Sequence, residues 1–89
     1  MEIPTKGKVL LDFYADWCGP CKAMKNTLEQ FEESSDVPLK KINVDHEPQL
    51  AQKYGIRSIP CFIAIEDGTE VKKKLGVTSL EQLKSLWDK

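Results

Sequence analysis

The sequence has little of several features that mark particular protein classes. Its 89 residues include one histidine and three cysteines, and 13 lysines and arginines nearly balance 14 aspartates and glutamates, for a net charge of -1. Nucleic acids and anionic membranes are bound by clustered positive charge, so this balance argues against both as partners. An odd number of cysteines does not suit a disulfide-stapled secreted scaffold, and a reducing, cytoplasmic setting is expected instead.

Long hydrophobic runs are also missing. The longest strongly apolar stretches, Val9-Leu10-Leu11 and Cys61-Phe62-Ile63-Ala64-Ile65, fall far short of the roughly 20 residues that a membrane-spanning helix needs. The opening residues carry an acid at position 2 and no apolar stretch, which is not typical of a secretory signal. We therefore expect one small domain over residues 1–89, without membrane association.

Hydrophobic patterning predicts four strands. A nearly continuous apolar run over residues 9–15 suits a strand that is buried on both faces, and alternation over residues 39–44 predicts a second strand. Residues 61–65 predict a third. The pair Asp67-Gly68 is a hairpin signal that leads into a fourth, edge-like strand over residues 71–75.

Three helices are predicted between and after these strands. Over residues 19–34, apolar side chains recur at steps of three and four, which places them on one helical face. A short helix over residues 48–54 begins with proline, and Gly55 provides its C-terminal stop. Thr78 or Ser79 can cap a final helix at the end of the chain.

The resulting order is strand, helix, strand, helix, strand, strand, helix, an α/β arrangement written βαβαββα. The first strand–helix–strand unit implies a parallel pair with a right-handed crossover, and the later hairpin adds an antiparallel pair. We therefore predict a four-stranded mixed sheet with helices on both faces.

The sharpest chemical feature is the run Trp17-Cys18-Gly19-Pro20-Cys21, at the point where the first strand passes into the first helix. Two cysteines three residues apart on a first helical turn are close enough for a disulfide that opens and closes without large backbone movement. At the helix N-terminus, unpaired N–H groups stabilise a thiolate, so Cys18 is the expected nucleophile. Cys21, one turn further on, is expected to be more buried and to act as the resolving thiol.

The pentapeptide and its surroundings resemble the thioredoxin family. Trp-Cys-Gly-Pro-Cys is that family's signature, and further landmarks follow in the family's order over most of the chain. These landmarks are Leu11-Asp12-Phe13-Tyr14-Ala15, Lys41-Ile42-Asn43-Val44-Asp45, Lys53-Tyr54-Gly55-Ile56-Arg57-Ser58-Ile59-Pro60, Asp67-Gly68 and Leu75-Gly76. The resemblance implies a protein-disulfide reductase that works through Cys18 and Cys21, with Gly19 and Pro20 favouring the reducing end of the family's range.

The resemblance also implies an acid–base pair beside the cysteines. Asp12 interrupts the apolar first strand, and the family places a buried aspartate there, which accepts the proton of Cys21. Lys41 on the neighbouring strand matches the partner of that aspartate. From the residues alone, an exposed Asp12 and a solvated Lys41 would be favoured, so both roles depend on the resemblance.

A substrate surface is implied in the same way. In the family the bond corresponding to Ile59-Pro60 is cis, which lets the Ile59 backbone pair with an extended substrate segment, while the proline blocks metal capture. Trp17, Ile59, Gly76 and Val77 would form an apolar rim around the Cys18 sulfur. From the residues alone, Pro60 is a proline at the start of a strand and Gly76 a turn glycine.

Two departures from the family pattern are visible. Few residues precede the first strand, which indicates the short form of the fold without the N-terminal strand and helix, and lower stability than the longer form. Cys61 follows Pro60 where the family usually has threonine. We interpret Cys61 as a buried small hydrophobic residue, with a third redox-active thiol as the alternative.

The resemblance further implies disulfide-containing protein substrates, re-reduction by a separate NADPH-dependent thioredoxin reductase, and no bound cofactor or metal. We expect a monomer. The short chain suggests a glutaredoxin-like, glutathione-dependent enzyme as an alternative, although the Gly19-Pro20 pair argues against it. A second alternative is an accessory subunit of a larger enzyme. A zinc site at Cys18, Cys21, His46 and Cys61 is disfavoured because only one of its ligand pairs is local.

Overall fold

The computed structural model describes residues 1–88. All four predicted strands are present, with bounds within two residues of those expected. The elements are β1 (Lys8–Tyr14), α1 (Gly19–Lys22), α2 (Lys25–Ser34), β2 (Leu39–Asn43), α3 (Pro48–Lys53), β3 (Cys61–Glu66), β4 (Thr69–Leu75) and α4 (Leu80–Lys84). None of the helices in this range has the length and apolarity to cross a membrane.

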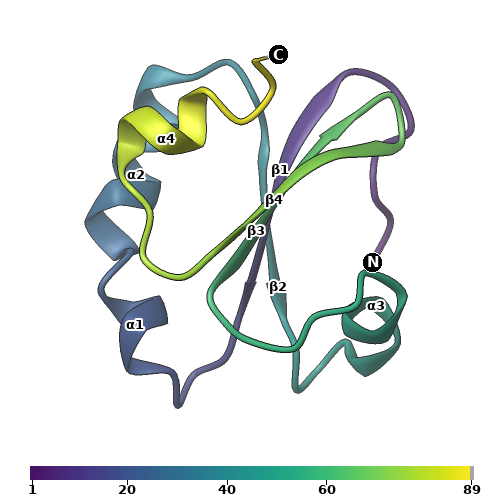
Figure 1. Cartoon of the computed structure of the whole chain (residues 1–89), viewed down its shortest axis with the longest axis vertical. Helices are drawn as coiled ribbons and strands as arrows, with labels where there is room; N and C mark the ends of the chain where they lie inside the picture. The colour runs from purple at the N-terminus through teal and green to yellow at the C-terminus, as the bar shows by residue number, and fades with distance from the viewer. Residues whose placement is uncertain (89) are drawn as a thin grey trace.

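The strands form one sheet in the order β2-β1-β3-β4 (Figure 1). The β1 and β2 strands run parallel, and the β1–β3 and β3–β4 pairs are antiparallel, so the predicted mixed sheet is confirmed. The long apolar runs occupy the two central strands, β1 and β3, which are buried on both faces. The lysine-rich β4 lies at an edge, as expected of a strand exposed along nearly its whole length.

Helices cover both faces of the sheet, with α1, α2 and α4 on one side and α3 on the other (Figure 1). Because successive strand residues point to opposite faces, Leu10 faces α2 and α4, while Val9 and Leu11 face α3. Each face has its own cluster of fully buried side chains. Asp12 shares the face of Leu10, and this places its carboxyl group on the side of the first two helices.

The hairpin between β3 and β4 follows the sequence signal. Asp67 and Gly68 both have positive φ, 52° and 82°, as the two central residues of a tight hairpin turn require. Asp67 also holds the segment before β1, because its carboxylate accepts the Gly7 backbone N–H at 2.8 Å.

The single helix predicted over residues 19–34 is wrong, because the helix breaks at Ala23 and Met24. The Met24 N–H donates to the Cys21 carbonyl at 3.1 Å, three residues back, and a new helix restarts with the Leu28 N–H donating to the Met24 carbonyl at 2.9 Å. The Met24 side chain is fully buried. Apolar spacing alone does not register such a break, because Met24 at the break packs in the same core cluster as Leu28 and Phe31 of α2.

The final helix is capped by Ser79, one of the two predicted candidates. Its hydroxyl accepts the Gln82 N–H at 3.1 Å, and the Gln82 side chain accepts the Ser79 N–H at 3.2 Å, which makes a capping box. The other candidate, Thr78, is buried, and its hydroxyl donates to the Gly76 carbonyl at 2.9 Å. Trp87 lies beyond the helix, where its indole N–H donates to the Ile65 carbonyl at 3.0 Å.

Candidate active site

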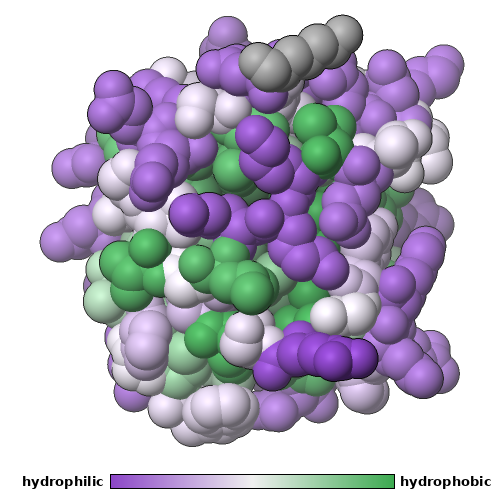
Figure 2. Space-filling view, viewed as in Figure 1, coloured by the Kyte–Doolittle hydropathy of each residue, from purple (hydrophilic) through white to green (hydrophobic). Residues whose placement is uncertain are grey.

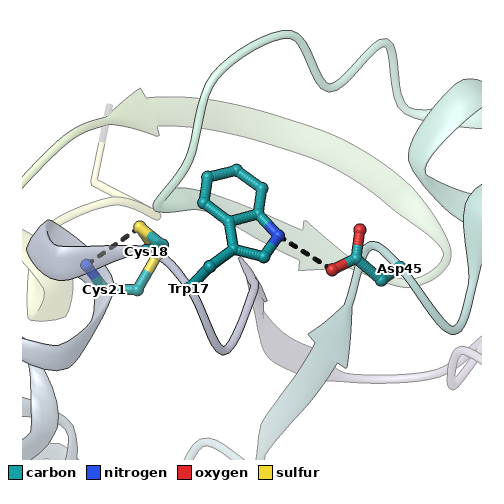
Figure 3. Close-up of a disulfide and its surroundings, with 4 residues drawn as sticks. All are labelled: Trp17, Cys18, Cys21 and Asp45. Atoms are coloured by element: carbon teal, nitrogen blue, oxygen red, sulfur yellow. Dashed lines mark hydrogen bonds between the residues drawn. A yellow bond between two sulfur atoms is a disulfide. The ribbon is translucent and has the colours of Figure 1, made fainter.

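The two cysteines of the signature form a disulfide at the junction of β1 and α1 (Figure 3). Their Cα atoms are 5.2 Å apart, within the usual range for a disulfide, so the predicted proximity is confirmed. Cys18 has an extended backbone and occupies the N-cap of α1, where its sulfur accepts the Cys21 backbone N–H at 3.1 Å. In the dithiol form, a Cys18 thiolate at this position would be stabilised by the same N–H group.

The N-terminal helix that Cys18 caps is only four residues long. The expected stabilisation of a thiolate therefore comes from the N–H groups of this first turn rather than from the dipole of a long helix. The physical reason is that the dipole effect falls off within about one turn, and the break after Lys22 separates α1 from α2.

The predicted order of burial of the two cysteines is wrong. Cys18 is 4% exposed, whereas Cys21 is partly exposed. Cys21 lines a cavity of about 390 Å³, and Cys18 does not. We call it the rear cavity. It is lined by Asp12, Tyr14, Ala15, Asp16, Cys21, Lys22, Lys25, Leu28 and Lys41.

The rear cavity brings together three predicted site residues from different elements: Asp12 on β1, Lys41 on β2 and Cys21 on α1. Asp12 and Lys41 are paired in register across the parallel strands. Asp12 is 4% exposed, so the buried position implied by the resemblance is correct and the exposed one is not.

Burial raises the pKa of the Asp12 carboxyl from 3.8 to about 6, because desolvation disfavours the charged form. The positive charge of Lys41 lowers it again in part. In the described part of the chain, the Lys41 ammonium and the Asp12 carboxylate do not form an ion pair within 4.0 Å. The effect of Lys41 on the Asp12 pKa is therefore a longer-range electrostatic one. Asp12 is therefore a carboxyl group whose pKa lies closer to neutral than usual, in a cavity that Cys21 also lines.

Trp17 stands on the other flank of the disulfide, with 69% of its surface exposed. Its indole N–H donates to the Asp45 carboxylate at 2.9 Å, a bond that fixes the ring beside the cysteines (Figure 3). A second, smaller pocket of about 220 Å³ joins Trp17 to Ile59. Its remaining lining residues are Val44, Ala51, Ile56, Arg57 and Ser58.

The Ile59-Pro60 peptide bond is cis, as the resemblance implied. The Pro60 carbonyl accepts the Gly76 N–H at 2.8 Å, so the two loops lie against each other. Gly76 has a φ of 82°, which glycine adopts readily. Val77 follows with 63% of its surface exposed, and Figure 2 shows apolar surface gathered around the end of β4 and the loop into α4.

Cys61 directly follows the cis-proline but belongs to the core cluster on the opposite face of the sheet from the rear cavity. Its side chain is fully buried in the core on the α3 side of the sheet, and it is a free thiol. Burial raises the pKa of the thiol to about 11; Lys73 lowers it in part, and Glu70 and Asp12 raise it. Within residues 1–88, no three histidine, cysteine or acidic side chains gather closely enough to hold a metal ion.

Sequence reasoning missed two residues that support the site. Asp45 holds the Trp17 ring, and the Met24 sulfur accepts the Thr78 backbone N–H at 3.4 Å, which ties the loop after Gly76 to the helix break. A signal for Asp45 existed, because β1 and β2 are parallel and the residues that follow them meet at one edge of the sheet. No sequence signal marks the contact between Met24 and Thr78.

Comparison of the sequence with known proteins identifies the family of this chain. Residues 2–89 match the family model for thioredoxin. Thioredoxin from Chlamydia caviae is 45% identical over 78 residues, which cover 86% of this chain and 76% of that protein. Thioredoxin from Bacillus subtilis is 40% identical over 87 residues, covering 96% and 84%.

Solved structures agree with these matches. A point-mutant thioredoxin from Halobacterium salinarum superposes with a TM-score of 0.86 at 38% identity, over 93% of this chain and 74% of that one. Reduced thioredoxin pre-protein from Schistosoma mansoni gives 0.86 at 32% identity, over 93% and 78%. The chain therefore belongs to the thioredoxin family of disulfide oxidoreductases, and it carries out thiol–disulfide exchange through Cys18 and Cys21.

Proposed function

We propose that the Cys18 thiolate begins the exchange by attacking one sulfur of a target disulfide. A bond forms between Cys18 and that sulfur, and the other target sulfur leaves as a thiolate and takes a proton from solvent. Cys21 then attacks Cys18, releasing the second target thiol and closing the intramolecular disulfide. The target gains two electrons, and the protein loses two. The single observation that carries this assignment is the Cys18 sulfur at the N-cap, accepting the Cys21 N–H.

Asp12 is the proposed proton acceptor for Cys21 in the second step. Asp12, Cys21 and Lys41 line one cavity, and this supports the role. A carboxylate that solvent can reach can take the thiol proton directly or through a water. A group with a pKa near 6 can accept a proton at neutral pH and return it to solvent. Lys41 is the proposed positioning residue, because its charge keeps Asp12 ionised in a buried setting.

The proposed substrate surface consists of Trp17, Ile59, Pro60, Gly76 and Val77. Because Cys18 is only slightly exposed, the target disulfide must approach the Cys18 sulfur closely. An extended target segment that pairs with the Ile59 backbone as an added strand meets this requirement. The exposed Trp17 and Val77 side chains provide apolar contact on either side of it. Gly19 and Pro20 are the proposed determinants of the reducing potential.

The proposed setting is a monomer of one domain, residues 1–89, in the cytoplasm. A free third cysteine is compatible with a compartment in which thiols stay reduced. The disulfide itself is the redox group, and no bound cofactor is part of the proposed cycle. After each turnover an NADPH-dependent thioredoxin reductase restores the dithiol, and the substrates are disulfide-containing proteins.

Turnover of insulin disulfides tests this proposal. The protein and Cys18→Ser are compared in two coupled assays, NADPH with thioredoxin reductase and NADPH with glutathione and glutathione reductase. We expect activity in the first assay and none for the variant. Activity only in the second would instead indicate the glutaredoxin-like alternative, and full turnover with dithiothreitol alone would indicate a different reductase.

A further inference from the structure

The free edge of the sheet along β4 is open to a further strand. The Gly76 N–H donates to the Pro60 carbonyl at 2.8 Å, and from that pair onward every second residue of β4 bonds to β3. The residues between them, Lys73 and Leu75, point their backbone N–H and C=O groups the other way. Among residues 1–88, β4 has no neighbouring strand on that side. We call residues 72–75 the β4 edge.

Two lysines of the β4 edge share one face of the sheet. Lys72 and Lys74 lie across from Ala64 and Phe62, which belong to the core cluster packed against α2 and α4. Cross-strand neighbours point to the same face of a sheet, so both lysine side chains leave it on the α4 side. Within residues 1–88, neither lysine forms an ion pair within 4.0 Å. This side of the edge therefore carries two positive charges that the fold does not neutralise.

The face of the β4 edge that turns toward α3 is different. Lys73 donates from its ammonium group to the Tyr54 carbonyl at 2.6 Å, so its charge is already engaged at the end of α3. Leu75 is 55% exposed and adds an apolar side chain to this face. Glu70, the acid of β4, lies on this face as well and does not offset the two lysines on the α4 side.

Charge decides which strand the β4 edge can accept. Its lysines disfavour pairing with a second copy of this chain, because like charges would face each other across the new ladder. The same lysines attract a segment with acidic side chains at the facing positions. Only alternate side chains of a strand share a face, so these acids must be two residues apart. An apolar residue beside one of them would lie opposite Leu75.

The β4 edge runs directly into the proposed substrate surface. The β4 strand ends at Leu75, and the loop that leads from it to α4 begins with Gly76 and Val77 of that surface (Figure 1). A protein bound at the disulfide therefore lies close to the end of β4. A second extended segment of the same protein can then reach the β4 edge.

We propose that the β4 edge binds an extended acidic segment of a target protein as an added strand. The backbone groups of Lys73 and Leu75 hold the segment, and the two lysines on the α4 side select its charge. Binding of an acidic strand stands on the β4 edge alone. That the segment belongs to a disulfide-containing target rests on the proposed function.

The first test measures the binding of three end-capped peptides to the oxidised protein by NMR. The acidic peptide is Thr-Val-Glu-Thr-Glu-Val-Thr, whose near-symmetry allows it to pair in either direction. The second peptide has lysine in place of both glutamates. The third, Thr-Val-Glu-Glu-Thr-Val-Thr, keeps the composition but places its glutamates next to each other, so that only one of them can face the lysines.

We expect the acidic peptide to bind most tightly. The amide hydrogens of Lys73 and Leu75 should exchange more slowly in its presence, because an added strand gives each of them an acceptor. The lysine peptide should not bind, and the third peptide should bind about two- to fivefold more weakly, as the loss of one exposed ion pair implies.

Three results would overturn the proposal. One is equal binding of the three peptides, and another is binding without protection of the Lys73 and Leu75 amides. The third is protection that rises with protein concentration in the absence of peptide, since a second copy of the chain would then occupy the β4 edge.

Lys72→Gln and Lys74→Gln test the selection of charge. Each should weaken binding of the acidic peptide by about two- to fivefold, and added salt should remove the difference from the unchanged protein. Lys40→Gln is the matched control, because Lys40 lies on β2 at the opposite edge of the sheet. An equal loss of binding in Lys40→Gln would mean that the peptide responds to overall charge and would refute the β4 edge.

A kinetic measurement tests whether the bound segment belongs to a target. A small cyclic disulfide peptide is joined by a glycine–serine linker to the acidic segment, or to the same segment with threonine for both glutamates. The acidic substrate should have a KM about two- to fivefold lower at unchanged kcat, and Lys72→Gln with Lys74→Gln should abolish the difference. Equal KM values for the unchanged protein would refute the role in target binding. Insulin turnover, measured in parallel, reports on the proposed function separately.

Discussion

Asp12, the proposed proton acceptor, is a residue whose charged form the folded state disfavours. A carboxyl group that is 4% exposed among apolar side chains loses most of its hydration, and Lys41 compensates only in part. The folded protein therefore holds the Asp12 proton more tightly than the unfolded chain does. Ionising Asp12 in the folded state therefore lowers the stability of the protein, and the same raised pKa suits its proposed role as proton acceptor for Cys21.

Asp12→Asn should stabilise the protein at neutral pH and slow its turnover. Because the pKa rises from 3.8 to about 6 on folding, the folded state binds more protons between these values, and stability falls as the pH rises through them. Above about pH 6, ionised Asp12 lowers the unfolding free energy by its full amount, on the order of 3 kcal/mol. The asparagine variant does not carry this destabilisation. Insulin reduction should fall by on the order of tenfold or more.

Urea unfolding of both proteins at pH 3.5 and pH 8 checks the first part. The stability gain should be large at the higher pH and nearly absent at the lower one, where the carboxyl is mostly protonated in both states. A gain of the same size at both values would mean that Asp12 acts through packing rather than ionisation.

Cys61 should behave as a structural side chain. Its thiol is fully buried, and burial raises its pKa to about 11, so little thiolate is present or accessible at pH 8. With the disulfide intact, iodoacetamide should label the native protein hardly at all and the urea-unfolded protein once. Mass mapping after mild oxidation should find only the bond between Cys18 and Cys21. A disulfide that includes Cys61, or rapid native labelling, would support a third redox-active thiol instead.

At the scale of elements, the break between α1 and α2 links the disulfide to the loop after β4. Met24 occupies the break, lies in the core between the sheet and the helices, and accepts the Thr78 N–H through its sulfur. The Pro60 carbonyl accepts the Gly76 N–H on the other side of that loop. The two contacts fix the loop that carries Val77 from both flanks.

Met24→Leu and Met24→Ala should separate the packing of this side chain from its hydrogen bond. Leucine keeps most of the volume and removes the acceptor, which should cost about 1 kcal/mol of unfolding free energy. Alanine also leaves a cavity and should cost about 2–5 kcal/mol. Urea unfolding measures both values. Amide exchange of the Thr78 N–H should accelerate in Met24→Leu, and an unchanged exchange rate would show that the sulfur contact does not hold the loop.

At the scale of the whole molecule, the core depends on the centre of the sheet. Two central strands, β1 and β3, carry most of the fully buried side chains of both faces. The chain covers 74% and 78% of the two thioredoxin structures compared above, and both of its edge strands carry lysines. A smaller fold buries a smaller share of the surface that its unfolded chain exposes.

Urea unfolding of this chain beside the Bacillus subtilis relative should show the effect of size. The dependence of the unfolding free energy on urea should be weaker for this chain, because it scales with the surface that unfolding exposes. The free energy in water should also be lower. Equal slopes and equal free energies for the two proteins would contradict this expectation.

Patterns that act over short stretches of chain were predictable from the sequence. The continuous apolar runs identify β1 and β3, the Asp67-Gly68 pair identifies the hairpin, and the spacing of Cys18 and Cys21 places a disulfide on one helical turn. Each of these features is determined within a few residues of the chain: the strands by their apolar runs, the hairpin by its turn conformation, and the cysteine pair by the rise of a helix. The resemblance of the motifs then supplied the family.

Only the tertiary structure decided the relations between distant residues. The cavity that Cys21 lines has walls from β1, β2 and the first two helices, and Met24, at the helix break, packs in a core cluster with residues of the sheet, α2 and α4. The raised pKa of Asp12 depends on how completely those elements remove water from it. Burial and electrostatics are sums over neighbours in space, and these neighbours are fixed only when the strands and helices have come together.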